Sequence, residues 1–297
     1  MSFRVTHTTT YAYGSEITTA HNQARLAPRN SARQSRRSFA LEVFPVPDDM
    51  HEFTDFFGNR ADHFSIHTNH RKLVVRAVSE VELKPLDLQL DFDAIAAQGT
   101  WENAALLLQS STERRDLDAR QFLLDSPLVH RSNDLADFAR GSFLPGRSVV
   151  EAYLDLNHRI AREFRYQPGT TTTTTGIEEV LEKRRGVCQD FAHLAIGCLR
   201  SVGLPARYVS GYIETTSPQG QDDLRGADAS HAWVSGYVPG WGWLDFDPTN
   251  DVVPKDQHIT TAWGRDYGDV APLRGIVFSG GGGHTMDVAV EVTRLPA

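Results

Sequence analysis

Cys188 is the residue of this sequence whose type and position could most directly support chemistry. It is one of only two cysteines in 297 residues, and it follows Gly186 at the start of an apolar-periodic segment that predicts a helix over about 187–202. Unpaired backbone N–H groups and the positive end of a helix dipole favour a thiolate at such a position. A thiolate is a nucleophile. Position alone is equally compatible with a buried helix cysteine.

Cys198 is predicted to be a core residue. It lies in the middle of the same helix, within the apolar stretch LAIGCL. A rise of 1.5 Å per residue places it about 15 Å along the helix axis from Cys188, which is too far for a disulfide. Two cysteines are also too few for a cysteine-rich zinc site.

A cysteine nucleophile requires a base, and His231 is the best placed of the 12 histidines. It begins the alternating strand HAWVSGYV directly after a long polar loop, where a side chain can face a cleft. A base in turn requires a carboxylate that orients its ring. Asp245 and Asp247 both lie on the next strand of the predicted hairpin and share a face by alternation. Asp247 precedes Pro248 at the strand end, level with the start of the His231 strand, and is therefore the favoured partner.

The elements that must position these residues fall into three parts. Residues 1–95 contain short alternating β-branched and aromatic runs between turn clusters, which predict an N-terminal β-sandwich domain of about seven or eight strands. Residues 96–147 predict a helical connector. Residues 148–297 predict an amphipathic helix, the cysteine helix and an antiparallel sheet, and the tail predicts a hairpin with a glycine-rich turn. The expected fold class is therefore α+β.

Composition and charge exclude several function classes. The net charge of −8 and a pI of about 5.8 argue against a nucleic-acid-binding surface. No stretch of about 18 uncharged apolar residues occurs, so we expect no membrane span. The first residues, MSFRVTHTTTYAYGSE, lack the pattern of a secretory signal, and we therefore expect a cytoplasmic protein. The sequence predicts no cofactor and leaves the oligomeric state open.

Three linked segments, GVCQDFAHL, PARYVSGY and SHAWVSGYVPGWGWLDFDPTN, resemble the transglutaminase-like superfamily. YAYGSEITTAHNQARLAPR and FGNRADHFSIH near the start, and GRDYGDVAPLRG near the end, are similar to its bacterial branch with an N-terminal β-domain, so the resemblance covers almost the whole chain. It implies a papain-like core in which Cys188, His231 and Asp247 form a Cys–His–Asp triad. The calcium-site pattern of the animal cross-linking enzymes is not found in the sequence.

The resemblance implies acyl chemistry at an amide of a protein or peptide. The thiolate would attack the carbonyl, His231 would protonate the leaving nitrogen, and a thioester would form. Water would then give hydrolysis and an amine would give transamidation. We favour a cysteine peptidase or amidase, because transamidation requires dedicated shielding from water. The alternatives are a protein-glutamine transamidase and a non-enzymatic binding or scaffold protein. A zinc site made of the same three residues is a further hypothesis.

The remaining candidates line the predicted cleft. The backbone N–H of Cys188 is the default oxyanion donor. The resemblance suggests Tyr166 as a second donor, although a packing tyrosine at a helix end is an equal alternative. Gln189, Tyr212 and Trp233 are predicted to line the cleft. Asp190, in the first helical turn, is expected to stabilise the helix dipole.

Overall fold

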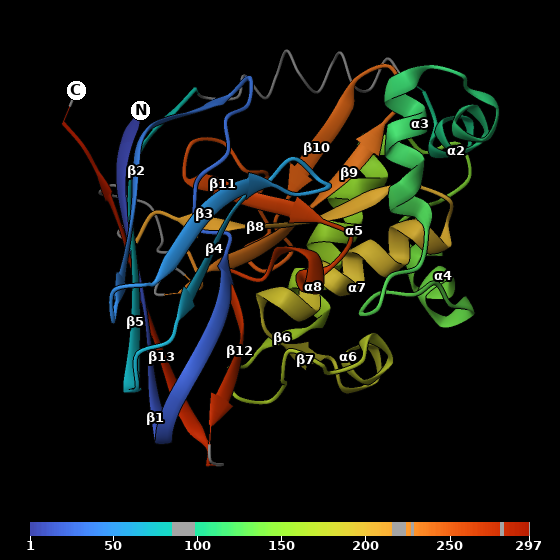
Figure 1. Cartoon of the computed structure of the whole chain (residues 1–297). Coiled ribbons are helices and arrows are strands. Elements are labelled where there is room, and N and C mark those ends of the chain that lie inside the picture. Colours follow the sequence, from blue (N-terminus) through green and yellow to red (C-terminus); the bar gives the residue numbers. More distant parts are fainter. Residues whose placement is uncertain (85–98, 216–223, 227–228, 280–281, 297) are drawn as a thin grey trace.

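The described residues form two antiparallel β-sheets, a short parallel two-stranded ladder and a group of helices that gathers on the side of the smaller sheet away from the larger one (Figure 1). The computed structural model describes residues 1–84, 99–215, 224–226, 229–279 and 282–296. The strands are β1 (Ser2–Ala24), β2 (Gln34–Phe44), β3 (Asp49–Thr54), β4 (Arg60–Ile66), β5 (His70–Leu83), β6 (Arg165–Tyr166), β7 (Arg185–Gly186), β8 (Ala206–Ile213), β9 (His231–Val238), β10 (Gly242–Phe246), β11 (His258–Gly264), β12 (Leu273–Ser279) and β13 (His284–Arg294). The helices are α2 (Trp101–Ser110), α3 (Arg114–Arg120), the 3₁₀ turn η1 (Gln121–Leu123), α4 (Asn133–Arg140), α5 (Val149–Glu163), α6 (Ile177–Lys183), α7 (Cys188–Ser201) and α8 (Tyr267–Val270).

The larger sheet is built around the 23-residue strand β1. The first half of β1 pairs with β5 and β13, and its second half pairs with β4 and β12. All four partners run antiparallel to β1. Strands β2 and β3 extend the sheet beyond β5 and β4. The alternating burial of β1 side chains follows from this position, because one face of the strand packs on a core.

The tail of the chain departs from the prediction. Because β12 and β13 are both antiparallel to β1, they run in the same direction and do not form a hairpin. They also complete the larger sheet, so the structure places them with the N-terminal strands (Figure 1). The described part of residues 1–95 contributes five strands, not seven or eight, and the tail supplies two more. The predicted boundary between residues 95 and 96 lies outside the described residues.

The smaller sheet carries the elements predicted for the second half of the chain. Its strand order is β10-β9-β8-β11, and all pairs are antiparallel. The predicted amphipathic helix, cysteine helix and β9–β10 hairpin are confirmed as α5, α7 and the pair β9 and β10. The expected α+β class with antiparallel sheets is therefore correct. None of the described helices has the length and apolar character needed to cross a membrane.

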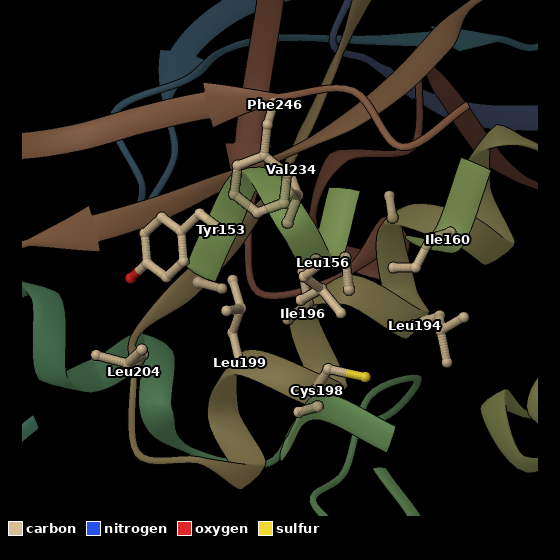
Figure 2. Packing of buried hydrophobic residues seen from close by; sticks show 14 of the residues in the cluster. Tyr153, Leu156, Ile160, Leu194, Ile196, Cys198, Leu199, Leu204, Val234 and Phe246 are labelled. Carbon is tan, nitrogen blue, oxygen red and sulfur yellow. The ribbon is translucent and has the colours of Figure 1, made fainter. Parts of the chain in front are cut away.

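Helix α7 packs on the smaller sheet through an apolar core (Figure 2). Cys198 and Leu199 of α7 are fully buried in this core, together with Leu156 of α5 and Val234 of β9. Cys198 is thus the core residue that the sequence predicts, and burial raises the pKa of its thiol to about 12. Each large apolar side chain buried in this way contributes about 1.5–3 kcal/mol. The core therefore fixes α7 against β9.

A second apolar contact joins the two sheets. Phe3 of β1, Val81 of β5 and Val292 of β13 pack with Tyr212 of β8 and Ile259 of β11. All five side chains are buried. The two sheets therefore share an apolar interface.

Gly211 is a sensitive point in the smaller sheet. A Cβ atom at this position would lie 2.1 Å from the carbonyl oxygen of Ile259 and 2.6 Å from the Trp233 ring. We expect Gly211→Ala to push β8 and β11 apart and to lower the free energy of unfolding by about 1–3 kcal/mol, the usual cost of overpacking. Gly283→Ala is the matched control, because its added methyl would meet no atom within 4 Å. Chemical denaturation measures both, and equal midpoints would contradict the prediction.

Candidate active site

The start of α7, which carries Cys188, is fixed by the Asp190 side chain. Its Oδ2 accepts the backbone N–H of Val187 at 2.8 Å and the Thr171 hydroxyl at 2.7 Å. A Cβ atom at Gly186 would lie 2.7 Å from the same oxygen, so glycine is required for this close approach. Asp190 thus stabilises the N-terminus of α7, which is the structural role expected for it. The Cys188 side chain is half-buried and packs against the α7 core.

His231 and Asp247 form a hydrogen-bonded pair that is closed off from solvent. Nε2 of His231 lies 2.8 Å from Oδ2 of Asp247, and both side chains are buried. Oδ2 also accepts hydrogen bonds from the side chains of His258 at 3.1 Å and Asn250 at 2.7 Å. Oδ1 accepts the backbone N–H groups of Thr249 and Asn250 at 2.9 and 3.3 Å. Five donors therefore surround one carboxylate.

This pairing determines the charge of the His231 ring. Burial alone lowers the pKa of the imidazole, but the charge and hydrogen bond of Asp247, with a smaller contribution from Cys188, outweigh burial and raise the pKa to about 10. Burial alone raises the pKa of Asp247, whereas His231 and His258 together hold it well below its usual range. At neutral pH the pair is therefore an imidazolium and a carboxylate.

The second ring nitrogen of His231, Nδ1, would lie 3.0 Å from a Cβ atom at Gly226. Cys188 lies close enough to the ring to supply a smaller part of its raised pKa. Nδ1 is buried and makes no hydrogen bond of ordinary geometry with a described residue. Catalytic hydrogen bonds often tighten only when substrate is bound.

Tyr166 lies beside this space. Its strand β6 pairs in parallel with β7, and Tyr166 is the register partner of Gly186, two residues before Cys188. A Cβ atom at Gly226 would lie 3.0 Å from Nδ1 of His231 and 3.7 Å from the Tyr166 hydroxyl. The hydroxyl and the imidazole therefore border the same space. This location is compatible with a donor to an oxyanion.

The other predicted cleft residues lie elsewhere or serve other contacts. Gln189 donates its side-chain amide to the carbonyl of Thr173 at 3.2 Å. Tyr212 is not a cleft residue, because it is buried between the sheets with its hydroxyl 3.1 Å from Nδ1 of His7. Strand alternation gives the face of a side chain but does not reveal that β1 covers this end of β8.

Trp233 lies next to the pair instead of in an open cleft. Its side chain is fully buried, and its ring centroid is 6.2 Å from that of His231 and 5.2 Å from that of His258. Its indole N–H donates to Oδ2 of Asp245 at 3.2 Å. Asp245 is the alternative candidate for the carboxylate that orients His231. Its Oδ2 instead accepts from Trp233, and Asp247 binds His231.

Sequence reasoning missed three residues of the site. His258 comes from β11, on the opposite edge of the sheet from β10, so no local spacing connects it to His231. Gly226 precedes β9 in a polar loop and has φ +84°, a conformation that favours glycine. Asn250 is the last residue of the segment DFDPTN, and a turn in which backbone N–H groups bind an aspartate could have indicated it.

Two groups of described residues could hold a metal ion. His231, Asp247 and His258 form one group, and Asp49, His51 and His63 on the larger sheet form the other; the ligand atoms within each group lie within 4.8 Å of one another. In the first group the hydrogen bonds described above occupy these atoms, so a metal would have to replace the contacts that set the ring's charge. Cys188, which the zinc hypothesis included, is not part of this group.

Comparison with known proteins defines the class. Residues 3–82 match the family model described as the bacterial transglutaminase-like N-terminal region, and residues 137–248 match the transglutaminase-like superfamily. Rv2569c, an uncharacterized protein of Mycobacterium tuberculosis, is 41% identical over 98% of this chain and 92% of its own. The chain therefore belongs to the transglutaminase-like superfamily.

Further similarities support the fold. The uncharacterized protein ML0607 of Mycobacterium leprae is 36% identical over 98% of both chains. A crystal structure of a Cytophaga hutchinsonii protein superposes with a TM-score of 0.77 at 24% identity, over 100% of this chain and 91% of the other. A protein-glutamine gamma-glutamyltransferase of Pseudomonas aeruginosa is 31% identical over 50% of this chain and 23% of its own.

The raised pKa of His231 predicts a pH-dependent contribution to stability. Because this pKa rises from 6.5 to about 10 on folding, the contribution is complete below pH 6.5 and is lost as the pH rises through about 10. We expect the difference in free energy of unfolding between Cys188→Ala and Cys188→Ala/His231→Gln to shrink over this window. In the Cys188→Ala background the part of the raised pKa that Cys188 supplies is absent, so the loss is complete at a lower pH than in wild type. Denaturation at several pH values measures the difference, and a constant value would show that the ring is neutral.

Gly226 predicts a steric test of the site. A methyl group in Gly226→Ala would lie 3.0 Å from Nδ1 of His231 and 3.7 Å from the Tyr166 hydroxyl, on the side of the ring that does not face Asp247. We expect slower alkylation of Cys188 by iodoacetamide, measured by mass spectrometry. Gly169→Ala is the matched control, since it has a similar positive φ but no atom within 4 Å of the added methyl. Equal rates in the two variants would contradict the prediction.

Proposed function

We propose that this protein is a cysteine-dependent hydrolase of amide or peptide bonds in proteins or peptides. The observation that carries the proposal is a buried imidazolium that Asp247 holds through one nitrogen, whose other nitrogen makes no hydrogen bond of ordinary geometry and whose pKa is raised in part by Cys188 at the start of α7. A positive charge next to the sulfur stabilises the thiolate form. Membership of the transglutaminase-like superfamily supports the same conclusion.

The reaction follows from these positions. The thiolate of Cys188 attacks the carbonyl carbon, and the carbonyl electrons move to oxygen, where Tyr166 and the Cys188 backbone N–H are the candidate donors. When the oxyanion collapses, the C–N bond breaks and His231 gives its proton to the leaving nitrogen. A thioester and a neutral imidazole remain. The imidazole then takes a proton from water, whose oxygen attacks the thioester, and collapse of this second intermediate releases the carboxylic acid and the Cys188 thiolate beside the imidazolium.

The alternative is transfer of the acyl group to an amine. It differs only in the acceptor, since an amine takes the place of water at the thioester. The name of the Pseudomonas aeruginosa relative favours this reaction, but that protein is matched over only 23% of its length. Water is the simpler acceptor because it needs no shielding from solvent.

A peptide and isopeptide library analysed by mass spectrometry tests the proposal. We expect wild type to cleave members of the library and Cys188→Ala to be inactive, because the nucleophile is lost. Cys198→Ala is the control, since its thiol lies in the core. Addition of an amine separates the two reactions: a product that gains the amine indicates transamidation. Turnover by Cys188→Ala would exclude the thiol mechanism.

The two partners of the thiol should differ in their effect. We expect His231→Ala to reduce turnover nearly as much as Cys188→Ala, because the proton donor is lost. Asp247→Ala should reduce it less, because the carboxylate orients the ring without transferring a proton. Iodoacetamide should alkylate Cys188 faster than Cys198 in wild type, and His231→Gln should remove most of this difference. Equal and slow alkylation of both cysteines in wild type would favour a scaffold protein.

A further inference from the structure

A cavity of about 400 Å³ lies between the two sheets, behind the carboxylate of the site. Its walls include Arg207 of β8, Trp233 of β9 and His258 of β11, and the segment between β1 and β2 closes it from the other sheet. Cys188 does not line it. His258 binds Asp247 through Nε2 and also lines this cavity, so the cavity and the site lie on either side of one imidazole.

The lining of the cavity is aromatic and positively charged. Four of the five tryptophans of the chain line it, namely Trp233, Trp241, Trp243 and Trp263. Its charged residues are Arg29, Arg33, Lys84, Arg207 and Lys255, against the single carboxylate of Asp245. This balance is opposite in sign to the net charge of −8 of the whole chain. The cavity is therefore suited to an anion with an apolar or planar body.

Arg207 is the central cation of the cavity. Its side chain is only 9% exposed, yet it makes no hydrogen bond and no ion pair with any described residue, and its Nε is buried without a partner. Arg200, the other buried arginine of this region, donates to the carbonyls of Phe122, Ala206 and Arg265 and to the Ser126 hydroxyl. A buried cation without hydrogen-bond acceptors is costly. Arg207 therefore requires a partner that Arg200 already has.

The stacking of Arg207 determines how a partner can bind. The guanidinium carbon lies 4.2 Å from the centroid of the Trp243 ring and 3.8 Å from that of the Trp263 ring. Both rings contact the guanidinium group, and the N–H groups along its edge make no hydrogen bond with a described residue. That edge matches the two oxygens of a carboxylate or phosphate. Asp245 makes no hydrogen bond to this edge, and its Oδ2 accepts the indole N–H of Trp233.

We propose that this cavity binds a small organic anion whose carboxylate or phosphate group is held by the edge of Arg207 and whose body packs on the tryptophan walls. The site is separate from the thiol and does not depend on the proposed hydrolase activity. Its occupancy can therefore be measured on the full chain without a turnover assay.

Calorimetric titration of the full chain tests the proposal with benzoate, phenyl phosphate, inorganic phosphate and the uncharged benzyl alcohol. We expect saturable binding of one aromatic anion per chain, weaker binding of inorganic phosphate, and none of benzyl alcohol. Tighter binding of benzoate would identify a carboxylate site, and tighter binding of phenyl phosphate a phosphate site. No saturable binding of any of the three anions, or equal binding of benzyl alcohol, would overturn the proposal.

Two substitutions with opposite expected effects locate the anion. Arg207→Met should weaken binding by about tenfold or more, the scale of a lost hydrogen bond to a charged group. Asp245→Asn should tighten it, because the only carboxylate of the cavity lining is removed. Arg76→Met, on the exposed side of β5 and outside the cavity, is the control and should bind as wild type does.

Circular dichroism establishes that each variant is folded. Unchanged affinity in folded Arg207→Met would overturn the proposal. If Arg207→Met does not fold, Asp245→Asn decides, and unchanged or weaker binding in that variant would overturn the proposal.

Tryptophan fluorescence gives an independent readout of binding. The change in fluorescence on binding should persist in Trp101→Phe, which removes the single tryptophan that does not line the cavity. Loss of the change in Trp101→Phe would show that the anion binds elsewhere.

Discussion

The hydrogen bond between His231 and Asp247, closed off from solvent, is the interaction on which the site depends. Burying two charges carries a large desolvation penalty, which is offset only when the remaining acceptor sites are satisfied. Here the carboxylate accepts five hydrogen bonds, from His231, His258, Thr249 and both the side chain and the backbone of Asn250. The same contacts set two properties of the ring, its orientation and its proton. The ring is an imidazolium at neutral pH because the charge and hydrogen bond of the carboxylate outweigh the effect of burial.

Three separate parts of the structure position Cys188 and Tyr166 relative to His231. Asp190 and Gly186 fix where α7 begins, and the short β6–β7 ladder places Tyr166 next to that point. The apolar core between α7 and β9, which includes Leu199 and Val234, then fixes the helix against the strand that carries His231. The distance between sulfur and imidazole therefore depends on core packing far from either atom. A substitution in this core would therefore change the position of Cys188 relative to His231, although the substituted residue contacts neither.

Local patterns predicted the parts of the fold whose contacts are close in sequence. The helix at Cys188 and the hairpin that carries His231 and Asp247 follow from apolar periodicity, strand alternation and a short turn. The tail strands and Tyr212 were predicted wrongly for a shared reason. Each packs on or pairs with β1, more than 190 residues away in the chain, and no local pattern shows which distant strand covers a face. His258 was missed for the same reason, since its contact with Asp247 crosses the sheet.

Two aspartates at the end of β10 lie in different surroundings: Asp245 faces the cavity, and Asp247 belongs to the candidate active site. Asp245 and Asp247 are two positions apart, yet Asp245 accepts from Trp233 beside the cavity and Asp247 accepts from two histidines. His258 and Trp233 stand between these environments, with their ring centroids 5.2 Å apart. The cation of the cavity, Arg207, lies within electrostatic reach of Asp245, whereas Asp247 is surrounded by donors of its own. A change of charge in the cavity therefore acts on Asp245 and Trp233 directly, and His258, which lines the cavity and binds Asp247, connects it to the imidazolium.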